Sequence, residues 1–178
     1  MSKLKPNAWV LIASLAFVGG ANAQQATPAA NSPDAVPDKM PFATPYGAPI
    51  SLERAQSAIS AAIAEAGRRG WAENVAVVDS GANLVAFARM DGAQLASIAI
   101  AEHKARASAG FRRPTKAFED GVQKSDNKSL LTLDGVIASR GGIPLIEDGK
   151  LIGAIGCSGG INLQDEATCM AGAATINK

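Results

Sequence analysis

A single histidine lies among basic residues in an alanine-rich stretch of the chain. His103 is followed closely by Lys104, Arg106, Arg112 and Arg113. A neutral imidazole can be an axial ligand of haem iron, and nearby cations can hold carboxylates or haem propionates. The alternatives are a solvated surface histidine, which is the default for a lone histidine, and basic residues that complement a helix C-terminus. On the first interpretation, the candidate cofactor-binding residues are His103, Lys104, Arg106, Arg112 and Arg113, with His103 as the metal ligand.

Two glycine-containing loops make a second candidate site. The segment RMDG (89–92) ends one predicted hairpin, and GCSGG (156–160) ends another. Glycines let backbone N–H groups approach an anionic or carbonyl group, or they only turn the chain tightly. Asp165 could bind a cation, act as a base, or be an ordinary acidic residue of a helix N-terminus. The candidate substrate-binding residues are Arg89, Asp91, Gly92, Lys104, Ser158, Gly159, Gly160 and Asp165.

Each loop follows two apolar runs that are joined by a turn. Asp148-Gly149 between such runs predicts a hairpin, because glycine tolerates the positive φ of a primed turn. Residues 80–83 (SGAN) predict a looser turn of the same kind. Two hairpins with similar endings should place the two loops at matching positions of one sheet, where we expect a ligand.

Helical segments flank both hairpins. Ser51 is a good N-cap for a helix that Gly67 and Gly70 end, residues 94–110 form a second helix, and residues 164–177 form the last. Thr115 is expected to cap a short helix over 118–122. The order α-β-β-α-(α)-β-β-α predicts an α+β fold with an antiparallel sheet and helices packed on it. The segment around Val136 could add a fifth strand.

Composition and the N-terminal residues predict a single exported domain. A chain of 178 residues with a net charge of +1 fits one soluble domain and gives no electrostatic reason to expect nucleic acid or an anionic membrane. Two lysines, an apolar run over 8–18 and an A-x-A site predict a signal peptide (1–23), cleaved after Ala23, and a periplasmic or secreted protein. Evenly spaced prolines predict an extended linker or arm over 24–49, whose later part docks on the domain (50–178) or on a neighbouring subunit.

The predicted export affects what is expected of the two cysteines. Export permits a disulfide between Cys157 and Cys169, although two buried thiols are the expectation. Cys157 as a nucleophile would need His103 as its base, on another element. The sequence has no zinc-ligand spacing, Walker loop, G-x-S-x-G elbow or Rossmann fingerprint. No catalytic residue is predicted.

Taken together, several runs resemble the GlcG/HbpS family of haem-binding-protein-like domains, which includes the C-terminal domain of PduO-type proteins. The resemblance covers roughly Ile50 to the C-terminus. The matching runs are VAVVDSGANLVAFARMDGAQLASIAIAEHKARASA (75–109), RRPTKAFED (112–120) and GGIPLIEDGKLIGAIGCSGG (141–160), followed by QDE (164–166).

The resemblance implies a profilin-like sandwich with a five-stranded antiparallel sheet and two hairpin–helix units. It also implies homo-oligomers, often octamers, which the alanine-rich second helix would suit, and haem binding in some members. Other members occur beside glycolate- or diol-utilisation genes. The first hypothesis is an exported haem-binding protein for scavenging, storage or sensing. The alternative is a small organic-acid enzyme or accessory protein with its pocket between the two glycine loops, and a third is a structural or interaction module.

Overall fold

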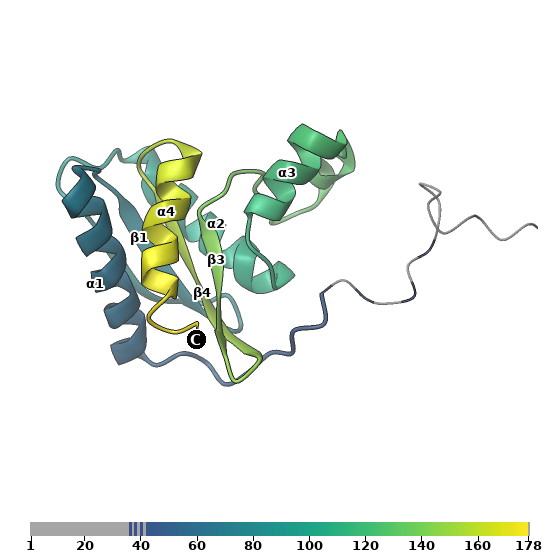
Figure 1. Cartoon of the computed structure of the whole chain (residues 1–178), viewed down its shortest axis with the longest axis horizontal. Helices are drawn as coiled ribbons and strands as arrows, with labels where there is room; N and C mark the ends of the chain where they lie inside the picture. Colours follow the sequence, from purple (N-terminus) through teal and green to yellow (C-terminus); the bar gives the residue numbers. More distant parts are fainter. Residues whose placement is uncertain (1–35, 37, 39, 41, 178) are drawn as a thin grey trace, which may run out of the picture. The chain divides into compact units, whose positions relative to one another are not determined.

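A four-stranded antiparallel sheet forms the centre of the protein. The computed structural model describes residues 36, 38, 40 and 42–177, so the predicted signal peptide and most of the first half of the linker lie outside the described residues. Strands β1 (Asn74–Asp79) and β2 (Leu84–Arg89) form the first predicted hairpin, and β3 (Gly142–Glu147) and β4 (Lys150–Ser158) form the second. The strand order is β2-β1-β4-β3, so the two hairpins join through β1 and β4 (Figure 1).

Both turns have the chemistry that the sequence predicts. Asp148 and Gly149 have φ angles of 48° and 71°, the positive values that a primed two-residue turn requires. In the first hairpin, the Asp79 Oδ1 atom accepts hydrogen bonds from the backbone N–H groups of Gly81, at 2.8 Å, and Asn83, at 2.9 Å. This side chain therefore holds the looser turn closed.

Helices cover both faces of the sheet. Helices α1 (Leu52–Arg69) and α4 (Asn162–Ala173) pack against one face, where alternate β1 residues such as Val75 and Val77 form the larger core. Helix α2 (Ala96–Phe111) packs against the other face through its alanines (Figure 1). The remaining helices are α3 (Lys116–Ser125) and the 3-10 helix η1 (Lys128–Thr132). None of the helices in the described part of the chain is long and apolar enough to cross a membrane.

Small residues set the distance between α2 and the sheet. A Cβ atom on Gly156 of β4 would lie 2.1 Å from the carbonyl oxygen of Ala101. Ala101, Ala105 and Ala109 are fully buried along this contact. The abundance of alanine and glycine in the sequence therefore reflects a helix that packs with its backbone close to the strand backbones.

Two expectations about the segments around the sheet are wrong. The segment around Val136 is not a fifth strand, because its backbone N–H bonds the carbonyl of Leu133 in a turn and Gly135 adopts a φ of 79°. Thr115 does not cap α3 with its side chain, because the Thr115 hydroxyl accepts the N–H of Gly142 at 2.9 Å instead. The α+β fold with an antiparallel sheet is confirmed, and the profilin-like description stays a prediction.

The described end of the predicted arm docks on the domain. The N–H of Gly47 bonds the carbonyl of Leu151 at 2.7 Å, and the N–H of Leu151 bonds the carbonyl of Pro45 at 2.8 Å. Strand β1 pairs with β4 only as far as Gly153. The arm therefore bonds backbone groups of β4 that lie beyond the end of β1.

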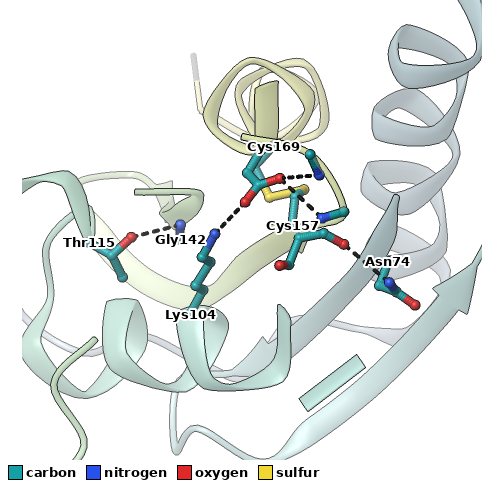
Figure 2. Close-up of a disulfide and its surroundings, with 10 residues drawn as sticks. Asn74, Lys104, Thr115, Gly142, Cys157 and Cys169 are labelled. Atoms are coloured by element: carbon teal, nitrogen blue, oxygen red, sulfur yellow. Dashed lines mark hydrogen bonds and ion pairs between the residues drawn. A yellow bond between two sulfur atoms is a disulfide. The ribbon is translucent and has the colours of Figure 1, made fainter. Parts of the chain in front are cut away.

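A disulfide joins β4 to α4. Cys157 and Cys169 are fully buried, their Cα atoms lie 5.6 Å apart and their sulfur atoms are bonded (Figure 2). The expectation of two free thiols is wrong, because α4 packs back onto β4 and brings the two side chains face to face. This distance depends on how the helix returns to the sheet, which residue spacing does not reveal.

Removing this disulfide should destabilise the protein. A cross-link between residues 12 apart restricts the unfolded chain, so its loss should lower the free energy of unfolding by about 2–4 kcal/mol. The measurement is urea unfolding of the oxidised protein, the reduced protein and the Cys157→Ala/Cys169→Ala variant. A reductant should lower the stability of the oxidised protein and leave the stability of the double variant unchanged. Equal stability of oxidised and reduced protein would contradict the pairing.

Candidate functional site

A buried ion pair connects α2 to α4. The Lys104 ammonium lies 2.5 Å from the Asp165 Oδ2 atom, and the two side chains are only 1% and 2% exposed. The other carboxylate oxygen, Oδ1, accepts the backbone N–H groups of Gly159, at 3.1 Å, and Gly160, at 3.0 Å. Figure 2 shows the Lys104 side chain pointing from α2 toward the disulfide side of the sheet. We call the three donors, Lys104 Nζ and the N–H groups of Gly159 and Gly160, the carboxylate slot.

Glycines on two loops allow this arrangement. Gly141 has a φ of 117°, and a Cβ atom there would lie 2.9 Å from the Asp165 Cβ atom and 3.1 Å from the Lys104 ammonium. A Cβ atom on Gly142 would lie 2.3 Å from the Lys104 carbonyl oxygen, and one on Gly159 would lie 2.2 Å from that of Ala72. A side chain at Gly141 or Gly142 would therefore collide with Asp165 or Lys104, and one at Gly159 would collide with the backbone before β1.

Glu73, which precedes β1, is a third ionisable group in this cluster. It is fully buried, and neither of its carboxyl oxygens has a hydrogen-bond partner among the described residues. Burial raises the pKa of Glu73 to about 8, helped by the negative charge of Asp165, while the charge of Lys104 opposes the shift. At neutral pH, Glu73 is therefore a neutral acid, and Asp165 alone balances the charge of Lys104.

The two glycine loops lie at the same end of the sheet, as the sequence predicts. Asn74 pairs with Arg89 of β2 on one side and with Ser158 of β4 on the other. Its amide Nδ2 donates to the Ser158 carbonyl at 3.2 Å (Figure 2). It also donates to the Gln94 carbonyl at 3.2 Å and so ties the second loop to the segment before α2.

The predicted substrate-binding residues nevertheless separate into two groups. Lys104, Asp165, Ser158 and the Gly159-Gly160 pair surround the buried cluster. Arg89, Asp91 and Gly92 are exposed on the other loop. The backbone N–H groups that were expected to hold a ligand are bonded to the chain's own Asp165.

The predicted cofactor-binding residues also divide. His103 directly precedes the inward Lys104, so the two side chains point about 100° apart around α2 and lie on different sides of the helix. His103 is half-buried beside the exposed Ala99, Arg106 and Gly110, and it makes no side-chain hydrogen bond within the described residues. Arg106 pairs with Glu102 at 2.7 Å.

Arg112 and Arg113 hold the arm. Arg112 donates to the Thr44 carbonyl at 3.1 Å and lies over the Tyr46 ring, at 5.3 Å from its centroid. Arg113 lies 3.5 Å from the centroid of the Phe42 ring, and burial lowers the pKa of its guanidinium. These two arginines therefore bind aromatic rings and backbone of the arm rather than lining the face that carries His103.

Sequence reasoning missed Glu73 and a second polar cluster. An acidic residue directly before a buried apolar strand was the only signal for Glu73. The second cluster centres on Arg140, whose Nε donates to Glu119 at 2.7 Å and whose Nη1 donates to Glu166 at 3.1 Å. It borders an open cleft of about 510 Å³ lined by Glu119, Gln123, Arg140, Ile161, Asn162 and Leu163. Within the described residues there is no group of three His, Cys, Asp or Glu side chains that could hold a metal.

Raising the pH should destabilise the protein through Glu73. Its pKa is 4.5 ordinarily and about 8 in the folded protein, so between these values the folded state binds more protons than the unfolded state. The stabilising contribution of neutral Glu73 is fully present below the lower value and is lost as the pH rises through about 8.

Urea unfolding at a series of pH values between about 6 and 9 measures this effect. Glu73→Gln keeps a neutral hydrogen-bond donor, so it should flatten the decline of stability with pH. The control Glu53→Gln changes an exposed carboxylate on α1 and should leave the decline unchanged. An equal decline in the Glu73→Gln variant would assign the effect to another group.

Comparisons with known proteins agree with this fold. The GlcG protein of Escherichia coli K12 is 35% identical over 109 residues, which is 61% of this chain and 81% of GlcG. A crystal structure of a double mutant of Streptomyces reticuli HbpS matches with a TM-score of 0.68 and 28% identity, covering 82% of this chain and all of that one. The crystal structure of a PduOC:haem complex matches with a TM-score of 0.65 and 28% identity, covering 72% of this chain and 96% of that one.

A family model described as haem-degrading protein, HbpS-like, matches residues 50–174. This range contains the four-stranded sheet and helices α1 to α4 of the described residues. The resemblance stated from the sequence is therefore confirmed, and the chain belongs to the HbpS-like family.

Proposed function

We propose that this protein is an exported haem-binding protein that serves haem scavenging, storage or sensing. The HbpS-like family model and the similarity to a PduOC:haem complex support haem as the ligand. The A-x-A site ending at Ala23 supports cleavage there and release into the periplasm or beyond. The proposal includes a profilin-like sandwich and a homo-oligomer, such as an octamer, which the resemblance implies.

The observation that carries this proposal is the outer face of α2. His103 is half-buried there without a hydrogen-bond partner in the described residues, and exposed Ala99 and Gly110 lie one and two turns away. Small side chains leave space for a flat macrocycle, and a neutral imidazole is a common haem ligand. Arg106 is 47% exposed and can exchange its Glu102 partner for a propionate. These residues therefore fit haem, which would supply a redox-active iron.

The remaining candidate residues have other partners. Lys104 is bound to Asp165 in the interior, and Arg112 and Arg113 hold the arm. His103 and Arg106 are thus the residues of this set that we propose to bind and orient haem. The organic-acid hypothesis is less well supported as the main function, because any ligand between the glycine loops must first displace Asp165.

A haem titration of the mature protein tests this function. The expected result is a saturable Soret change with a Kd of about 1 μM or below. His103→Ala should shift the Soret band and weaken binding at least about tenfold, because it removes the iron ligand. Arg106→Ala should weaken binding without changing the band position.

Two further variants act as controls. Met170→Ala removes an exposed sulfur on α4, and Arg112→Ala removes an arm contact, so neither should alter the Soret band. Weak, unsaturable binding that is the same in all variants would reject haem as a specific ligand of this protein.

A further inference from the structure

We propose that the carboxylate slot is a binding site for a small monocarboxylate, which the chain fills with its own Asp165 and from which an external carboxylate displaces it. This site is separate from the outer face of α2 and does not depend on haem binding. Its three donors converge on one carboxylate: Lys104 Nζ bonds Oδ2, and the N–H groups of Gly159 and Gly160 bond Oδ1. Both oxygens of a carboxylate are thereby recognised, by one cation and two backbone dipoles.

The charges of the cluster restrict the ligand to a single negative charge. Lys104 supplies one positive charge, and the neighbouring Glu73 is a neutral acid while Asp165 occupies the slot. Exchange of Asp165 for an external monocarboxylate leaves this balance unchanged. A phosphate dianion would add a second negative charge next to Glu73 in a buried site, which is costly.

The location of Asp165 allows the exchange. It lies in the first turn of α4, and the residue before this helix, Ile161, is 64% exposed. The disulfide fixes the helix at Cys169, one turn further along. Gly160 is exposed and Gly159 is half-buried, whereas the Lys104 and Asp165 side chains are 1% and 2% exposed, so the slot is closed while Asp165 occupies it. The exchange therefore requires the first turn of α4 to move away from the slot, while the disulfide keeps the rest of the helix attached to β4.

Size-matched chemical replacement tests the slot. Asp165→Ala removes a carboxylate and leaves a methyl group, so formate should fit the space; Asp165→Gly removes the methylene as well, so acetate should fit. Each matched anion should raise Tm saturably, because it binds only the folded state. It should bind about tenfold or more tightly than the mismatched anion, as expected for one methylene group.

The control variant is Glu166→Ala. It removes a neighbouring acidic residue of the same helix, one that pairs with Arg140 outside the slot, and its Tm should respond to neither anion beyond the effect of sodium chloride at equal ionic strength. Sodium phosphate should not stabilise the Asp165 variants. Equal stabilisation by chloride or phosphate, or no preference for the matched anion, would overturn the proposal.

Loss of the partner of Lys104 can leave either variant unfolded without added carboxylate. The same titration is then followed by circular dichroism. Recovery of the folded spectrum with the matched anion alone supports the slot, and a chain that stays unfolded at every anion concentration overturns it.

Displacement in the wild-type protein is tested by NMR. Acetate should shift the amide signals of Gly159 and Gly160 with a weaker apparent affinity than in Asp165→Gly, because only the population with Asp165 withdrawn can bind it. Absence of these shifts, at acetate concentrations that saturate Asp165→Gly, would overturn the displacement step.

Discussion

The buried positive charge of Lys104 is the constraint on which the rest of the structure depends. An ammonium group that is 1% exposed must be paired, because an uncompensated charge in the interior costs about 3–5 kcal/mol. Asp165 provides the counter-charge, and the amides of Gly159 and Gly160 satisfy its second oxygen. A change at any of these positions therefore affects α2, α4 and the loop after β4 together.

The same constraint explains the composition of the chain. For Lys104 to reach Asp165, α2 must lie very close to β4, and the loop before β3 must pass directly over the lysine. Gly156 and Gly142 permit these approaches, since a Cβ atom at either would lie within 2.3 Å of a backbone oxygen of α2. The alanine-rich face of α2 and the buried ion pair thus belong to the same close contact with the sheet. The outward side of α2, which carries His103, does not have to approach the sheet closely.

Local sequence signals predict the local structure well, and long-range packing decides the rest. Asp148-Gly149 and the Ser51 cap identify a hairpin and a helix start because their chemistry lies within a few residues. The apolar residues near Val136 suggested a strand, but the chain forms a turn there, closed by the Val136 N–H and the Leu133 carbonyl. For the site, the sequence identified the residue types. It did not predict the inward direction of the Lys104 side chain or the part played by Glu73, because both depend on which elements surround these residues.

The pairing of β1 with β4 also has a consequence for how the chain folds. The Asn74 side chain bonds the Ser158 carbonyl across 84 residues, and this strand pair lies at the centre of the sheet. Closing so long a loop is slow compared with forming either hairpin. On the ribosome, β1 has no partner on its inner edge until nearly the whole chain has been made. The domain is therefore expected to acquire its core late in synthesis, in a single step that joins its first and last hairpins.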